Sequence, residues 1–95
     1  MKKEAIIKKW NTFIQLPFPE IDNVNLQFEL TEIDSFSAGC ITRYLDGELD
    51  QECISILKQS LVDLSTHLNE IKGKEKSYFM LLHEIINDIK EHKGF

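Results

Sequence analysis

The stretch ISILKQSLVDLSTHLNEI, residues 54–71, decides the fold that this sequence predicts. Its apolar residues recur at alternating steps of three and four positions, at Ile54, Leu57, Leu61, Leu64, Leu68 and Ile71. This spacing lines one face of an α-helix with side chains that need a partner surface. Because the pattern covers fewer than three heptads, it predicts a face in a helical bundle core rather than an intermolecular coiled coil.

The residues around this stretch predict a pair of helices. Asp50 is expected to cap the first helix, because its side chain can accept a bond from a free backbone N–H. Gly73 is expected to end it, and the next helix covers residues 74–92 before Gly94. The short joint makes the two helices an antiparallel hairpin. The second helix carries its apolar residues at Tyr78, Phe79, Leu82, Ile85, Ile86 and Ile89.

Two more helices are predicted before this hairpin. Residues 2–15 place apolar side chains at helical spacing with lysines between them, which predicts a basic amphipathic helix. Such a helix can lie on a membrane, but three further helices here offer it a core to pack on. Pro17 and Pro19 end it. A helix that begins at residue 34 or 35 and ends at residue 46 follows, with Gly47 in the position of a left-handed cap.

The segment between these two helices is ambiguous. Residues 24–30 alternate apolar and polar side chains, as a strand does, within a connector over residues 16–34 that is expected to wrap one end of the bundle. The segment also fits helical spacing, at Leu26, Leu30 and Ile33. It is therefore an irregular or helical lead-in to the next helix, or a strand that pairs with a second copy of the chain. Gly39, in mid-helix, is expected to allow another helix to approach closely.

Composition predicts one soluble domain over residues 1–95. Hydrophobic residues make up 42% of the chain and charged residues 28%, which is typical of a folded globular protein rather than a disordered one. No apolar run approaches the ~20 residues of a membrane span, and no signal-peptide pattern follows residues 1–9. Cys40 and Cys53 are too few for a disulfide framework. We therefore expect a cytoplasmic protein with two free thiols and no membrane association.

Charge predicts the kind of partner. The net charge is −5, and no Lys or Arg occurs from residue 10 to residue 42. Such a chain repels phosphate backbones, which disfavours nucleic acid and fits a basic protein partner. Acids beside exposed aromatic residues form a plausible recognition surface. The predicted partner-binding residues are Glu20, Asp22, Phe28, Glu29, Glu32 and Asp34. The alternative is that the acids keep the protein soluble and that the phenylalanines, Phe18 and Phe36 included, cover an open end of the core.

Catalytic and metal-binding motifs are lacking. Asp63 with His67, and Asp88 with His92, share helix faces at four-residue spacing and could each supply two metal ligands. They fit equally well on an ordinary charged face. His83 has no such neighbour, and the chain contains no Cys-x-x-Cys, His-Glu-x-x-His or glycine-rich phosphate loop. We predict no metal, no cofactor, no catalytic residue and no enzymatic activity.

Several small and aromatic positions carry a resemblance. The run from Ala38 to Ile41 with Tyr44-Leu45, Gly47 and Leu49-Asp50, followed by Tyr78-Phe79 and Leu82, resembles a group of small uncharacterised bacterial helical proteins. The resemblance covers about the last sixty residues and implies a bacterial helical protein without implying an activity. In size and charge the chain is also similar to toxin-neutralising immunity proteins, which is an analogy of type without a motif.

Together these patterns predict an all-α fold, a compact four-helix bundle-like array with an irregular or extended connector between its first two helices. The predicted function is a non-enzymatic protein-interaction module, of an immunity or adaptor type, that binds a basic protein or a second copy of itself. The alternative is a helical domain that binds a small ligand or a metal through His67, His83, Cys40 or Cys53.

Overall fold

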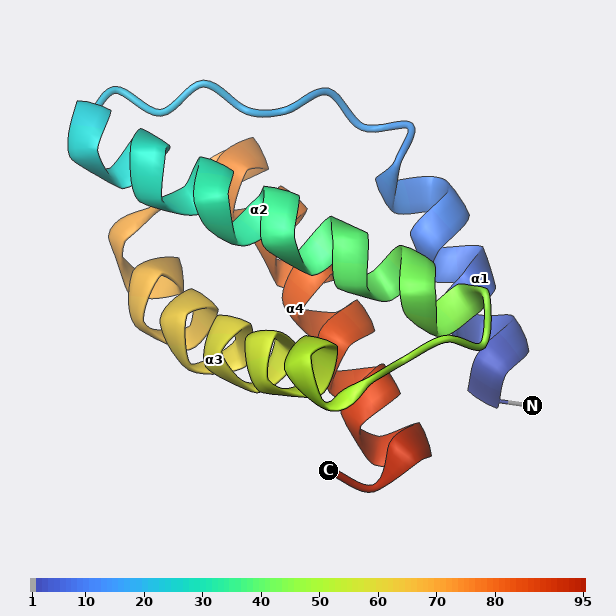
Figure 1. Ribbon diagram of the computed structural model, residues 1–95. Coiled ribbons are helices and arrows are strands. Elements are labelled where there is room, and N and C mark those ends of the chain that lie inside the picture. Colours follow the sequence, from blue (N-terminus) through green and yellow to red (C-terminus); the bar gives the residue numbers. More distant parts are fainter. Residues whose placement is uncertain (1) are drawn as a thin grey trace.

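The computed structural model describes residues 2–95 and confirms the all-α prediction. Four α-helices follow one another: α1 (Lys2–Phe13), α2 (Val24–Leu45), α3 (Gln51–His67) and α4 (Gly73–Lys93), with a short 3-10 helix, η1 (Leu68–Glu70), after α3. Helices α2 and α3 lie side by side and antiparallel, α4 crosses behind them, and α1 packs along α4 (Figure 1).

Helix α4 is the centre of the core because its apolar residues point to every other helix. Five of them are completely buried: Phe79, Leu82, Ile85, Ile86 and Ile89. Helix α1 adds Ile6 and Phe13, both buried, and the half-buried Trp10. The amphipathic first helix thus packs on the core, as its apolar stripe predicted.

Helix α3 presents a slightly different face from the predicted one. Leu57 and Leu64 are fully buried, whereas Ile54 lies outside the core cluster and Cys53 takes the inner position. Asp50 caps this helix as predicted, because its side chain accepts a bond from the backbone N–H of Cys53 at 2.8 Å. The predicted end was wrong: α3 stops at His67.

Glycines mark the turns, with one correction. Gly47 and Gly94 have φ of +78° and +77° after α2 and α4, in the left-handed region that the sequence predicted for both positions. Gly73, expected to end the third helix, instead begins α4 with φ of +63°. Its positive φ turns the chain from the joint into the last helix. The prediction of a turn at Gly73 was therefore right, but the residue starts α4 and does not end α3.

Helix α2 begins ten residues before the predicted start. Asn23 caps it, because its side-chain oxygen accepts from the backbone N–H of Leu26 at 3.1 Å. Leu26 and Leu30 are buried at helical spacing, so the helical period wins over the strand-like alternation. Residues 24–30 are therefore helical, and the strand that would form a dimer arm was a wrong alternative. The start at residue 34 or 35 was also wrong.

The connector is correspondingly short, running from residue 14 to residue 23 rather than from 16 to 34. From the end of α1 it runs beside α2 to the N-terminal end of that helix (Figure 1). The backbone N–H of Ile21 donates to Gln27 Oε1 at 2.7 Å, and Phe18 packs edge-on against Tyr78 and Phe79. These contacts fasten the connector to α2 and α4.

Gly39 corrects another expectation. The residue is exposed, and a Cβ built on it would meet no other atom within 4 Å. The predicted close approach of another helix at this position is wrong. None of the helices in residues 2–95 combines the length and the apolar character that crossing a membrane would require.

A candidate protein-binding groove

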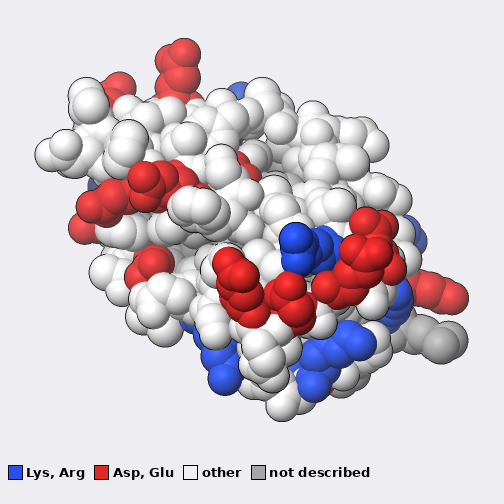
Figure 2. All heavy atoms as spheres, viewed as in Figure 1, with Lys and Arg blue, Asp and Glu red and all other residues white. Residues whose placement is uncertain are grey.

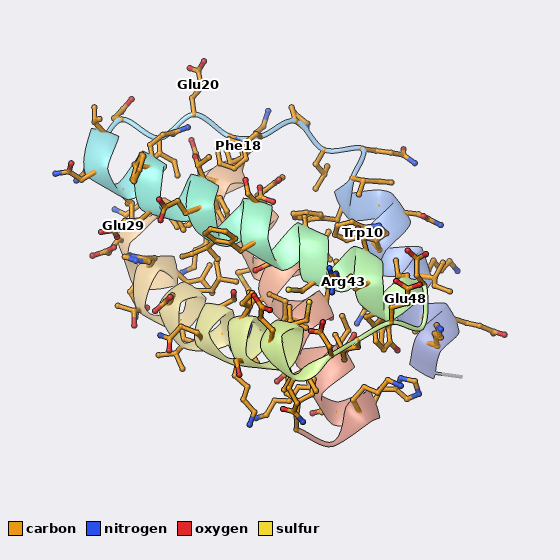
Figure 3. All side chains as sticks on the ribbon, viewed as in Figure 1. Trp10, Phe18, Glu20, Glu29, Arg43 and Glu48 are labelled. Carbon is orange, nitrogen blue, oxygen red and sulfur yellow. The ribbon has the colours of Figure 1, made fainter. Side chains whose placement is uncertain are left out.

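An open hollow lies where the start of α2 meets the joint between α3 and α4. Its volume is about 710 Å³. The connector supplies Glu20 and Asp22, α2 supplies Glu29, and the other side supplies Glu70 and Glu75. Lys72 and His67 are the basic side chains that line it. Figure 3 shows Glu20 projecting outward from the connector and Glu29 at the same end of α2.

A second hollow, of about 610 Å³, lies between α2 and α3. Ile33 and Phe36 of α2 and Ile56 of α3 form an apolar floor. Glu32 of α2 and Asp63 of α3 also line this hollow, one from each helix. On the face that Figure 2 displays, acidic side chains gather on both sides of uncharged surface at this end of the molecule.

The two hollows adjoin each other, because Glu29 and His67 line both. We call them together the acidic groove. Its acids are Glu20, Asp22, Glu29, Glu32, Asp63, Glu70 and Glu75, and its apolar floor is Ile33, Phe36 and Ile56. The groove thus combines a surface that attracts cations with one that gains free energy by losing contact with water.

The groove residues that α2 contributes lie on one face of that helix. Glu29, Glu32, Ile33 and Phe36 follow at steps that keep them on one face of the helix. This face lies beside the buried stripe that holds Leu30 against the core. Phe36 is 60% exposed, although it is a large apolar side chain in the middle of a regular helix.

Two buried serines, joined by a hydrogen bond, lie next to the apolar floor. Ser37 and Ser60 are both buried, and their hydroxyl groups are 2.9 Å apart in a hydrogen bond between α2 and α3. Ser60 also donates to the backbone carbonyl of Ile56 at 2.8 Å. The two hydroxyls keep α2 and α3 in register below the floor without leaving a buried polar atom unpaired.

His67 joins the two walls of the groove. Its Nε2 lies 3.0 Å from Glu29 Oε2 on α2, and its Nδ1 lies 2.7 Å from Glu70 Oε2 on η1. The side chain of His67 is 18% exposed. Sequence reasoning paired His67 with Asp63, whereas Asp63 accepts a bond from Gln59 at 3.0 Å. The partners of His67 come from another helix and from the following turn.

The structure brings together four of the six predicted partner-binding residues: Glu20, Asp22, Glu29 and Glu32 line the groove. Phe28 is 65% exposed on the outer side of α2 and lines neither hollow. Asp34 accepts a hydrogen bond from the Tyr78 hydroxyl at 2.6 Å, away from the groove. Burial raises the pKa of Asp34, and the bond from Tyr78 opposes that rise.

The sequence did not indicate Asp63, Glu70 and Glu75 as part of the acidic surface, and it placed Phe36 among the exposed phenylalanines without predicting it as a binding residue. The helical spacing of Phe36 from Glu29 and Glu32 was the signal that identifies it. The three acids lie 31 or more positions after Glu32 in the chain, and no local pattern indicates their closeness.

The cysteines are neighbours in a third hollow. Cys40 and Cys53 are free and buried, and both line a recess of about 250 Å³ beside Arg43 and Asp50. Burial, together with the neighbouring Cys53 thiol, raises the pKa of Cys40 to about 12. The Cys40 thiol therefore stays protonated at neutral pH, which suits a small apolar side chain more than a nucleophile or a metal ligand.

The two predicted carboxylate–histidine pairs do not act as pairs. Asp88 binds Lys9 at 2.6 Å, and His92 Nδ1 makes a hydrogen bond with the Tyr44 hydroxyl at 2.5 Å. His83 Nε2 lies 3.1 Å from the Ser65 hydroxyl. Within residues 2–95, no three His, Cys, Asp or Glu side chains are grouped so as to hold a metal ion.

Comparison of this chain with family models, with curated proteins and with solved structures found no match.

Proposed function

We propose that this protein is a non-enzymatic interaction module that binds a basic segment of another protein in the acidic groove. The observation that carries the proposal is an apolar floor with the exposed Phe36, lined by Glu29, Glu32 and Asp63, next to a hollow that adds four further carboxylates. Carboxylates accept charge-assisted bonds from Lys and Arg, and an exposed aromatic ring supplies the apolar contact that anchors an interface. An immunity or adaptor role would use such a surface, and the two free thiols fit a reducing compartment such as the cytoplasm.

The groove differs from two other acidic places on the molecule in its balance of acids and bases. Asp50 accepts a bond from Arg43 at 2.8 Å, and Glu84 and Asp88 both bind Lys9. Those acids already have basic partners within the chain. In the groove, Glu29 and Glu70 share the single side chain of His67. An external basic group therefore gains most where acids outnumber the bases beside them.

The test uses decalysine as a defined basic probe and follows the amide resonances of labelled protein by NMR. We expect the largest shift changes at Glu29, Glu32 and Asp63, around the floor of the groove. Saturable changes centred on Asp46 and Glu48, at the other end of α2, or changes spread evenly over all acids would overturn the proposal.

Two matched variants complete the test. The double change Glu29→Lys and Glu32→Lys alters the net charge by the same amount as Asp46→Lys and Glu48→Lys, and all four residues are exposed. We expect the first pair to weaken decalysine binding at least about tenfold relative to the second pair, with melting temperatures that differ little. Equal weakening by the two pairs would mean that the net charge alone attracts the probe.

A further inference from the structure

We infer that the occupant of the acidic groove is one amphipathic helix that carries basic residues beside its apolar face. The inference rests on the proposed function and specifies the partner more closely. It is carried by the chemistry of the groove, by the backbone of its walls, and by an interface of the same kind within the chain.

Helix α1 shows how this fold holds a basic amphipathic helix. Ile6 and Phe13 are buried against α4, which packs along α1. At the edge of this contact, Lys9 Nζ lies 3.0 Å from Glu84 and 2.6 Å from Asp88, two acids on the same face of α4. Apolar residues thus fill the centre of the interface, and a lysine reaches acids at its margin.

The acidic groove offers the same two components, and none of the described residues, 2–95, occupies it. Ile33, Phe36 and Ile56 provide the apolar contact, and Glu32 of α2 and Asp63 of α3 provide an acid from each helix. Between Asn23 and Phe36 the α2 wall is about 20 Å long at ~1.5 Å per residue. That length matches about 13 residues of helix lying along α2 and α3.

The backbone of the walls selects a helix over an extended segment. Both walls between residues 24 and 67 are largely α-helical, so their backbone groups are already bonded within α2 and α3. An extended peptide gains affinity by adding to a strand edge, and residues 2–95 contain no strand. On the apolar floor it would leave its own N–H and C=O groups unpaired. A helix satisfies its own backbone and presents side chains alone.

The chain contains a matched control for the apolar contact. Phe28 and Phe36 are phenylalanines on α2 with exposed fractions of 65% and 60%. Phe36 forms part of the floor, and Phe28 does not line the groove. Truncating each to alanine removes the same group from the same helix and separates groove contact from general hydrophobicity.

The experiment uses two 14-residue peptides of leucine and lysine with the same composition. In one the leucines lie on a single helical face, and in the other they are scrambled around the helix. Binding of the labelled peptides is measured by fluorescence anisotropy at 0.15 M salt, where surface attraction is partly screened. We expect the amphipathic peptide to bind at least about tenfold tighter than the scrambled one, and Phe36→Ala to remove most of that advantage. We expect Phe28→Ala to leave it unchanged within about twofold.

Each other outcome has a definite meaning. Equal binding of the two peptides by the groove overturns the helix inference and leaves the proposed binding of basic segments standing. Binding of neither peptide, together with no response to decalysine, overturns both. Equal weakening by Phe28→Ala and Phe36→Ala shows that the helix docks elsewhere on α2 and also overturns the inference.

Discussion

The interface between α1 and α4 and the acidic groove are built from the same kinds of residue and differ in what covers them. Each has an apolar centre and acidic margins, but α1 fills the first and no segment among residues 2–95 fills the second. Phe13 in the filled interface is 3% exposed, whereas Phe36 in the groove is 60% exposed. The same chemistry thus supports folding in one place and is available for binding in the other.

The largest expected effect that separates the two regions is the loss of an aromatic ring. Phe13→Ala removes a buried side chain that packs on Trp10 and Tyr78, and we expect it to lower the free energy of unfolding by about 3–5 kcal/mol. Phe36→Ala should change it by less than about 0.5 kcal/mol, because that ring is already largely in water. Urea unfolding followed by circular dichroism measures both. A loss above about 2 kcal/mol for Phe36→Ala would make the groove floor part of the core.

Gly39 tests whether the exposed side of α2 stays open beyond the groove, next to the recess that holds the two cysteines. The residue is exposed, and its added Cβ would touch nothing within 4 Å. We expect Gly39→Ala to stabilise the protein by about 0.5–1 kcal/mol, because alanine restricts the unfolded chain and favours helix. Gly47→Ala is the control, since φ of +78° makes alanine strained there and should destabilise. If thermal melting showed Gly39→Ala to be less stable than the parent protein, a close neighbour would have to exist at Gly39.

Lys9 tests how much the charges at the filled interface contribute. Lys9 is partly exposed, and Glu84 is more exposed than Asp88, so solvent screens the two ion pairs. Lys9→Ala should cost no more than about 1 kcal/mol, and less at high salt. Melting at low and high salt checks this, with Lys58→Ala on the exposed side of α3 for comparison. A larger loss that salt does not reduce would point to packing of the lysine stem instead.

The sequence predicted the four helices because their apolar residues repeat at helical spacing over many turns, as in α3 and α4. It did not resolve the start of α2, since residues 24–30 fit a period of two as well as one of 3.6. The deciding signal was local: Asn23 stands directly before the periodic residues, where a capping side chain is wanted. Burial of Leu26 and Leu30 then settles the period.

The part of the groove formed by the connector and α2 could also be predicted from the sequence. Acids that follow one another on the connector and α2, such as Glu29 and Glu32, had to share a surface once the helix was recognised. The contribution of Glu70 and Glu75 depends on how α3 and α4 return beside α2, which is a property of packing. Phe13 and Phe36 show the same limit: each belongs to a helical apolar pattern, and only the tertiary fold decides which is covered.

The smallest expected effect concerns Asp34, which lies on α2 but contacts Tyr78 instead of lining the groove. Burial raises its folded-state pKa above the ordinary 3.8, so the folded protein holds this proton to a higher pH than the unfolded chain does. Stability from this group is present below pH 3.8 and is lost as pH rises through the raised pKa. Asp34→Asn keeps an oxygen that accepts from Tyr78 and removes the titration.

The melting temperature of Asp34→Asn, relative to that of the parent protein, should therefore be higher at pH 7 than at pH 3. Binding of the amphipathic peptide should not change, because Asp34 faces Tyr78 rather than the groove. The opposite pH trend would mean that the ionised carboxylate is the better partner for Tyr78. A loss of peptide binding would place Asp34 in the binding surface after all, and would extend that surface around α2 to the side that α4 covers.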